Sequence, residues 1–114
     1  FEQLVADLYR AMGFRVQVTP HTRDGGIDVI ARGMGPGGEE HIIIQCKHYP
    51  GGVVGPQYVR ELIGAWEENR QATRAVLITS GQFSHEAGSL AHKHRIQLYD
   101  GADLVRLLAQ HKPR

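Results

Sequence analysis

The chain has 114 residues, and its 13 Lys and Arg residues nearly balance its 12 Asp and Glu residues, which gives a formal net charge of +1. This length predicts a single domain over residues 1–114, and the one cysteine excludes an internal disulfide and suits a cytoplasmic setting. The charge balance excludes a strongly basic nucleic-acid module, and no apolar run approaches the roughly 20 residues of a membrane span, so we expect no membrane contact from this segment.

Residues 1–47 are predicted to form a helix followed by three strands. Apolar residues at helical spacing, followed by Gly13, predict an amphipathic helix over residues 1–12. Its apolar stripe consists of Phe1, Leu4, Val5, Leu8 and Met12. Alternation over residues 14–19 predicts a strand whose inward side chains are Phe14, Val16 and Val18. Residues 27–32 and 41–47 predict a β-hairpin, because two β-branched apolar runs flank a glycine-rich loop at 33–40.

The apolar residues of this hairpin predict its register. Pairing of Arg32 with His41 places Asp28 opposite Gln45, and opposed residues share a face of the sheet. One face is then wholly apolar and consists of Ile27, Val29, Ala31, Ile42, Ile44 and Cys46. The other face holds Asp28, Ile30, Arg32, His41, Ile43, Gln45 and Lys47. A slip of one residue would mix the two sets, so we expect this register.

Residues 56–114 are predicted to form three helices that alternate with two strands. A helix starts at Pro56 with the stripe Val59, Leu62, Ile63 and Trp66, and residues 75–79 form a strand buried on both faces. Ser84 caps the next helix, residues 96–99 form a short strand, and the last helix follows Asp100. The last helix is expected to pack through Leu104, Val105, Leu107 and Leu108. These elements predict a three-layer α/β domain with a central mixed sheet flanked by helices.

Three side chains on the polar face of the hairpin indicate metal chemistry. The oxygens of Asp28 and Gln45 are suitable ligands for Mg²⁺, and Lys47 could orient a water molecule or neutralise charge on a phosphate. For each residue alone a solvated surface strand is the better interpretation, whereas the three together favour a catalytic site. Glu2 could face the same site, although a first-turn glutamate is also favoured by the helix dipole. A residue of the second helix could reach the site too, and the sequence leaves open whether it is Gln57, Arg60 or Glu61.

Asp28 followed by Gln45-Cys46-Lys47 resembles the D…(D/E/Q)-x-K signature of the restriction-endonuclease-like nuclease superfamily. Four segments in order narrow the likeness to the Mrr-type restriction endonuclease catalytic domain. They are residues 24–28, residues 44–49, Thr79-Ser80 with Phe83-Ser84 and Ala87, and residues 99–101. The short signature is a weak signal by itself, and the ordered set, which covers nearly the whole chain, is a strong one.

This resemblance implies a restriction-endonuclease-like fold and a metal-dependent endonuclease that hydrolyses DNA phosphodiester bonds, in restriction of modified foreign DNA. It implies catalytic Asp28, Gln45 and Lys47, with Mg²⁺, or Mn²⁺ in its place, bound by Asp28, Gln45 and the backbone carbonyl of Cys46. Glu2 is implied as a further metal ligand. Most of the superfamily has an acidic residue at the position of Gln45, so we expect weaker metal binding in this chain. The Mrr branch resembles this chain in carrying glutamine there.

The expected partner is DNA, and the modest charge predicts weak binding by this segment alone. Because the sequence starts at Phe1 without a methionine, we expect a domain of a longer chain that carries a companion DNA-recognition domain. A homodimer would suit double-strand cleavage. Candidate DNA contacts are Arg23, His48 and Tyr49, with His48 as a phosphate contact and not a catalytic base. The alternatives are a non-catalytic nucleic-acid-binding or protein-binding module with this fold, and a repair or junction-resolving nuclease.

Overall fold

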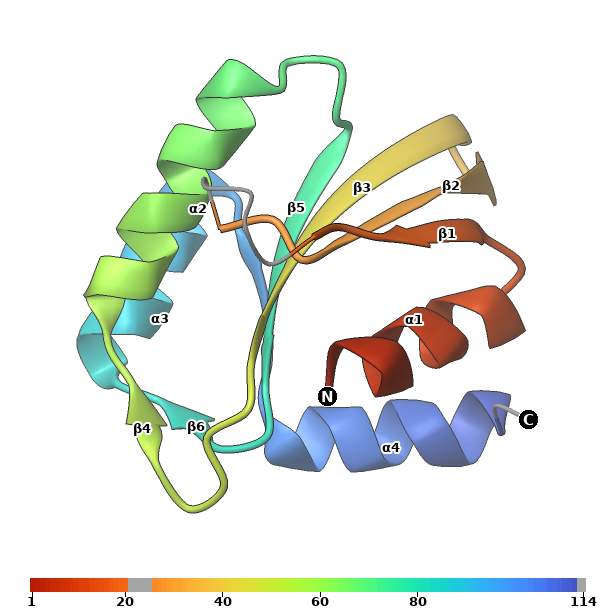
Figure 1. Ribbon diagram of the computed structural model, residues 1–114. Coiled ribbons are helices and arrows are strands. Elements are labelled where there is room, and N and C mark those ends of the chain that lie inside the picture. Colours follow the sequence, from red (N-terminus) through yellow and green to blue (C-terminus); the bar gives the residue numbers. More distant parts are fainter. Residues whose placement is uncertain (21–25, 113–114) are drawn as a thin grey trace.

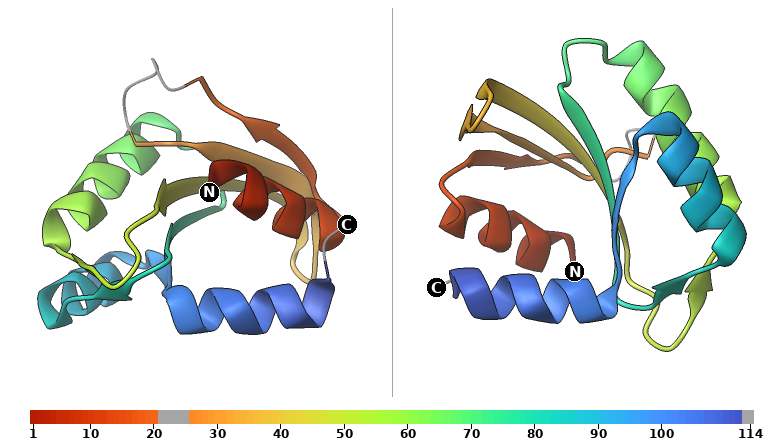
Figure 2. Two further views of the ribbon diagram at one scale, coloured as in Figure 1. Left: turned by 60° about the horizontal axis from the view of Figure 1, so that its bottom comes forward. Right: turned by 180° about the vertical axis from the view of Figure 1, so that it is seen from behind.

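The computed structural model describes residues 1–20 and 26–112, which form a three-layer α/β domain (Figure 1). A central sheet lies between α1 and α4 on one face and α2 and α3 on the other, as the two further views also show (Figure 2). The elements are α1 (Glu2–Ala11), β1 (Arg15–Val18), β2 (Val29–Gly35), β3 (Gly38–Lys47), β4 (Val53–Val54), α2 (Pro56–Glu68), β5 (Arg74–Thr79), β6 (Gln82–Phe83), α3 (His85–His94), β7 (Gln97–Tyr99) and α4 (Gly101–His111). The predicted fold class is therefore confirmed. No helix in these described ranges is long and apolar enough to cross a membrane.

The five strands of the sheet have the order β1-β2-β3-β5-β7. β1, β2 and β3 pair antiparallel, whereas β5 and β7 continue the sheet in parallel with β3. Strands β4 and β6 form a separate parallel pair that the sequence did not predict, since two-residue strands carry no alternation. The hairpin strands are longer than expected, because the ladder runs to Gly35 opposite Gly38 and leaves two residues for the turn.

The predicted hairpin register is correct as far as Val29, which pairs with Ile44. Beyond it the prediction is wrong, because the backbone N–H of Asp28 donates to the carbonyl of Ile44 at 2.8 Å, and Asp28 is not paired with Gln45 in the ladder. This offset moves Ile27 to the opposite face, where it packs against the core beneath α2 and α3. The face expected to be polar is buried in part, because Ile43 belongs to the core beneath α2 and α3 and Gln45 contacts α2.

Two apolar cores fill the spaces between the layers. The core on the side of α1 and α4 consists of Val5, Ala6, Leu8, Tyr9, Val29, Ala31, Ile42, Ile44, Cys46, Val76, Ile78 and Leu104. The core on the side of α2 and α3 consists of Ile43, Val54, Val59, Leu62, Ala65, Ala72, Ala75, Leu77, Ala87, Ala91 and Ile96. Each core buries alternate residues of β3 and β5, as expected for strands covered on both faces.

Three residues expected to pack inward are exposed instead. Leu4 is 41% exposed, Val18 is 37% exposed and Val105 is 68% exposed. Leu4 and Val105 lie on helix faces turned away from the sheet, and Val18 ends a strand at the edge of the sheet. The predicted cap of α3 is confirmed, since the Ser84 hydroxyl accepts a hydrogen bond from the backbone N–H of Ala87.

Candidate active site

The predicted carboxylate meets β3 at the point where the antiparallel ladder ends. Oδ2 of Asp28 accepts a hydrogen bond from the backbone N–H of Cys46 at 2.8 Å. The backbone carbonyl of Asp28 accepts from the N–H of Thr19 at 2.9 Å, which ties this segment to the end of β1. The N–H and C=O groups of one residue in an antiparallel strand point to the same edge of that strand. The carbonyl of Cys46 therefore faces the same edge of β3 as the Asp28 carboxylate.

The other two predicted catalytic side chains, Gln45 and Lys47 of β3, contact residues of helix α2. The Nε2 group of Gln45 donates a hydrogen bond to Oε1 of Glu61 at 2.7 Å. The Nζ atom of Lys47 lies 4.1 Å from the ring centroid of Tyr58, within the range of a cation–π contact. Tyr58 and Glu61 are three residues apart, so they occupy one side of the helix. Of the three α2 residues that the sequence left open, the structure places Glu61 against the predicted site.

Gln45 is buried although it is polar. Its residue exposure is 2%, and its Oε1 atom has no hydrogen-bond partner among the described residues. Gly26 packs against the same pair, and its φ of +71° lies in the left-handed region. A Cβ atom at Gly26 would lie 2.6 Å from Oε1 of Glu61 and 2.9 Å from Nε2 of Gln45. In Figure 1 the coloured trace of residues 26–28, which leads into β2, begins beside α2.

Glu2 and Asp28 both act on the thiol of Cys46. Burial raises the pKa of the Cys46 thiol far above its ordinary value, and the negative charges of Asp28 and then Glu2 raise the pKa further. The thiol is therefore protonated at neutral pH and is suited neither to nucleophilic attack nor to metal binding. The two carboxylates thus influence the same end of β3, one from α1 and the other from the residue that precedes β2.

The residues predicted to contact DNA differ in how far other parts of the protein hold them. The His48 ring stacks on Phe1 with 5.2 Å between ring centroids, and its Nδ1 atom lies 3.1 Å from the Ser80 hydroxyl. The same hydroxyl accepts from the backbone N–H of Tyr49 at 2.7 Å, while Tyr49 remains 54% exposed. The side chain of Tyr49 therefore has surface available for a ligand, and His48 is held by protein contacts. Arg23 lies outside the described residues.

The oxygen atoms of Asp28 and Gln45 suit a hard cation, but the described residues do not include a cluster of side chains that is typical of a metal site. Gln45 has a buried amide oxygen with no hydrogen-bond partner among the described residues, and the Asp28 carboxylate is bonded to the next residue of β3; such oxygens suit an ion such as Mg²⁺. Within residues 1–20 and 26–112, no group of three or more His, Cys, Asp and Glu side chains could hold a metal ion. Any such ion would therefore depend on amide and backbone oxygens as well as on carboxylates.

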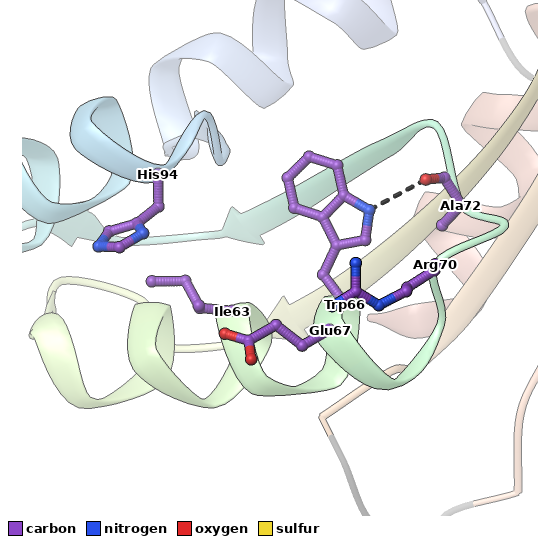
Figure 3. A pocket seen from close by; sticks show the side chains of 6 residues that line it. All are labelled: Ile63, Trp66, Glu67, Arg70, Ala72 and His94. Carbon is purple, nitrogen blue, oxygen red and sulfur yellow. Dashed lines mark hydrogen bonds between the residues drawn. The ribbon is translucent and has the colours of Figure 1, made fainter.

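A separate pocket of about 390 Å³ lies on another side of α2 (Figure 3). It is lined by Ile63, Trp66, Glu67, Arg70, Ala72 and His94. The indole N–H of Trp66 donates to the carbonyl of Ala72 at 3.0 Å, which fixes the ring against the chain that leads into β5. At about 100° per residue, these α2 positions lie roughly opposite Tyr58 and Glu61 around the helix. This pocket is therefore distinct from the hairpin site.

Comparison with known proteins identifies the family of the chain. The sequence model of the Mrr catalytic-domain family, described as a restriction endonuclease, matches residues 1–108. The chain belongs to this restriction endonuclease family. The resemblance noted from the sequence is thereby confirmed, and with it membership of a nuclease family with the restriction-endonuclease-like fold.

One curated relative and two solved structures illustrate the likeness. The uncharacterized protein y4cE of Sinorhizobium fredii is 30% identical over 107 residues, which are 91% of this chain and 27% of that protein. The DNA modification-dependent restriction endonuclease AspBHI matches with a TM-score of 0.77 and 28% identity, over 96% of this chain and 30% of that one. The MspJI restriction endonuclease, solved in complex with a 27-mer oligonucleotide, matches with a TM-score of 0.66 and 23% identity, over 95% of this chain and 27% of that one. The chain thus spans less than a third of each of these proteins.

Proposed function

We propose that this domain is a metal-dependent endonuclease that hydrolyses phosphodiester bonds of DNA. The observation that carries the proposal is the arrangement at the end of the hairpin, where Asp28 is bonded to Cys46 and α2 contacts both Gln45 and Lys47. Membership of a restriction endonuclease family supports the same reaction class. A solvated surface strand would not explain the burial of Gln45, which is only 2% exposed.

The proposed metal ligands are the Asp28 carboxylate, the Gln45 amide oxygen and the backbone carbonyl of Cys46, with Glu2 as a further ligand. A carboxylate has about four acceptor positions, so its bond to the N–H of Cys46 leaves capacity for other partners. Mg²⁺ bound there, or Mn²⁺ in its place, would polarise a phosphate oxygen and lower the charge that builds up during hydrolysis. The Cys46 N–H holds the Asp28 carboxylate in a fixed orientation while it binds.

The proposed role of Lys47 is to orient the attacking water or to stabilise the negative charge that develops on the phosphate. Hydrolysis adds the water oxygen to phosphorus and releases a sugar oxygen, and the charge on the other phosphate oxygens increases in the transition state. The ammonium of Lys47 is held over the Tyr58 ring, which restricts its position without neutralising its charge. It can therefore donate a hydrogen bond where the charge appears.

We propose DNA as the substrate, and modified DNA as the form to test first, because AspBHI is named for dependence on DNA modification. The formal net charge of +1 predicts that this segment binds DNA weakly, so recognition is assigned to a companion domain. Tyr49, two residues after Lys47, supplies an exposed aromatic ring for stacking or phosphate contact. Double-strand cleavage would require two such sites, which a homodimer would provide.

The test compares cleavage of supercoiled plasmid, unmodified or carrying 5-methylcytosine, with Mg²⁺, Mn²⁺ or EDTA. Asp28→Asn keeps an oxygen that can accept from Cys46, and Lys47→Met keeps the length of the stem. We expect both to lower metal-dependent cleavage by about 100-fold or more. Lys93→Met is the matched control, since Lys93 is exposed on α3 and should keep wild-type activity. Cleavage that persists in Asp28→Asn, or a full-length wild-type protein that is inactive on every DNA with every metal, would contradict the proposal.

One observation favours a second candidate, a nucleic-acid-binding module without catalysis. The described part of the chain holds no cluster of three or more His, Cys, Asp and Glu side chains suited to a metal. A binding module would retain DNA in a filter-binding or fluorescence assay equally well in EDTA and in Mg²⁺, and Asp28→Asn would leave that binding unchanged. This outcome, together with the absence of cleavage, would select the second candidate.

A further inference from the structure

We infer that Glu61 of α2 is a positioning residue, whose carboxylate orients the Gln45 amide so that the amide oxygen is the atom offered to a cation. The inference rests on the proposed function, because it assigns a supporting partner to one of the proposed metal ligands. The contact itself is the 2.7 Å hydrogen bond from Nε2 of Gln45 to Oε1 of Glu61. No pattern in the sequence joins these residues, which come from different elements.

The chemistry of the two groups permits only one orientation of the amide. An ionised carboxylate accepts hydrogen bonds and cannot donate them, whereas an amide can present either its NH₂ group or its oxygen. If the amide were turned over, its oxygen would face the Glu61 carboxylate and two acceptors would be in contact. The NH₂ group must therefore face α2, and Oε1 is left for another partner. Oε1 is buried and has no hydrogen-bond partner within the described ranges.

Packing around the pair restricts it further. Gln45 is 2% exposed, and the backbone at Gly26 approaches so closely that a Cβ atom there would overlap both Glu61 and Gln45. Other rotamers of the amide are therefore blocked on that side. Glu61 itself is exposed on its outer surface, so its carboxylate remains solvated while it holds a buried group. This combination fixes the amide without burying an unpaired charge.

The pair also changes the charge balance of the proposed site. Gln45 is neutral, but a negative charge lies one hydrogen bond away, on Glu61. Exchange of the two residues, Gln45→Glu with Glu61→Gln, would keep the net charge and the hydrogen bond, with the amide now donating from position 61. Gln45→Glu alone would place two carboxylates in contact at the buried end of β3, where like charges repel strongly.

The first test measures Mn²⁺ binding to the DNA-free protein by electron paramagnetic resonance, which reports free Mn²⁺. We expect Glu61→Ala to weaken Mn²⁺ binding at least about tenfold, as is common when a residue that orients a metal ligand is removed. The matched control is Glu67→Gln, because Glu67 lies on the same helix but lines the pocket of Figure 3. Equal affinity of Glu61→Ala and wild type would overturn the inference.

The second test needs neither metal nor DNA. We expect Gln45→Glu to lower the midpoint of thermal unfolding and the added Glu61→Gln to restore it, whereas independent sites would give additive shifts. The side-chain NH₂ resonances of Gln45 should also shift in Glu61→Ala and stay unchanged in Glu67→Gln, as measured by ¹⁵N NMR. Additive unfolding shifts, or NH₂ resonances that do not respond to Glu61→Ala, would overturn the contact.

Failure of the inference can be distinguished from failure of the proposed function. If Asp28→Asn abolishes Mn²⁺ binding and cleavage while Glu61→Ala changes neither, the nuclease stands and the role of Glu61 is wrong. If Asp28→Asn leaves Mn²⁺ binding unchanged and wild type cuts no DNA, both proposals fail, whatever the unfolding shifts show. Parallel losses in Asp28→Asn and Glu61→Ala, with wild-type behaviour in Glu67→Gln, would support both.

Discussion

Gly26→Ala tests how tightly the backbone at Gly26 packs against the Gln45–Glu61 pair. Two effects should destabilise the folded state in this variant. Gly26 has a φ of +71°, which an alanine adopts only with strain. The new Cβ would also lie 2.6 Å from Oε1 of Glu61 and 2.9 Å from Nε2 of Gln45, so the two side chains must move apart.

The two effects can be given separate magnitudes. A left-handed backbone costs a non-glycine residue about 1–2 kcal/mol. The hydrogen bond from a buried amide to a carboxylate that stays exposed contributes about 1–2 kcal/mol, less than for a fully buried charge. We therefore expect Gly26→Ala to lower the free energy of unfolding by about 2–4 kcal/mol, a large part of the stability of a typical domain.

The assay is equilibrium unfolding in urea, followed by circular dichroism. Gly13→Ala is the matched control, because Gly13 also has a positive φ, of +100°, but a Cβ there would meet nothing within 4 Å. It should report the backbone effect alone. In a Glu61→Ala background most of the overlap disappears, so Gly26→Ala should then cost about 1–2 kcal/mol less than in the wild type.

Two results would refute this reasoning. If Gly26→Ala and Gly13→Ala destabilise the protein equally, the backbone at Gly26 does not close over the pair. If the effects of Gly26→Ala and Glu61→Ala are additive, the two residues do not share a contact. In either case the proposal that Glu61 fixes the Gln45 amide would lose its support from packing.

Three further predictions concern other parts of the molecule. Tyr58→Leu should lower metal-dependent DNA cleavage by about tenfold, because it releases Lys47 from the aromatic ring. Tyr58→Phe keeps a ring 4.1 Å from Nζ of Lys47 and should be close to wild type in the plasmid assay. Equal activity of the two variants would argue against the contact. Burial, and then the charge of Arg32, lower the pKa of His41 below its ordinary value of 6.5, so the unfolded state binds more protons. The stability that the His41 imidazole contributes should be complete above pH 6.5 and should decline as the pH falls through the pKa that His41 has in the folded state. His41→Gln should therefore flatten that part of the curve of unfolding free energy against pH. An unchanged curve would contradict the assignment. Ser84→Ala should lower the free energy of unfolding by about 1 kcal/mol through loss of the α3 cap, as measured in urea, and Ser89→Ala, at an exposed position of the same helix, should have a smaller effect.

The sequence by itself determined the helices, the strands of the central sheet and most of the hairpin, but not β4 and β6. Alternation over the two hairpin strands set the register from Val29 to Arg32 against His41 to Ile44, because any slip would have placed polar side chains in the core. Helical spacing predicted all four helices, and Ser84 predicted a cap that the structure contains. Such patterns are local, so the chain encodes them within a few residues of each element.

Only the tertiary structure decided which side chains meet at the site. The margin of α2 offers Gln57, Arg60 and Glu61, and the choice depends on how far the helix is rotated and shifted along β3 when its apolar residues pack. Because α2 leads back from β3 toward β5, its earlier residue, Tyr58, meets Lys47 and its later residue, Glu61, meets Gln45.

The sequence pattern also did not predict where the ladder between β2 and β3 ends. Alternation predicts that Ile27 shares a face with Val29, but the one-residue offset at Asp28 turns Ile27 toward α2 and directs the Asp28 carboxylate to the N–H of Cys46. A β-bulge of this kind leaves one extra residue out of the ladder, and hydrophobic alternation does not mark its position. The pairing of the strands in the folded sheet, and not the local pattern, therefore sets the geometry of the proposed site.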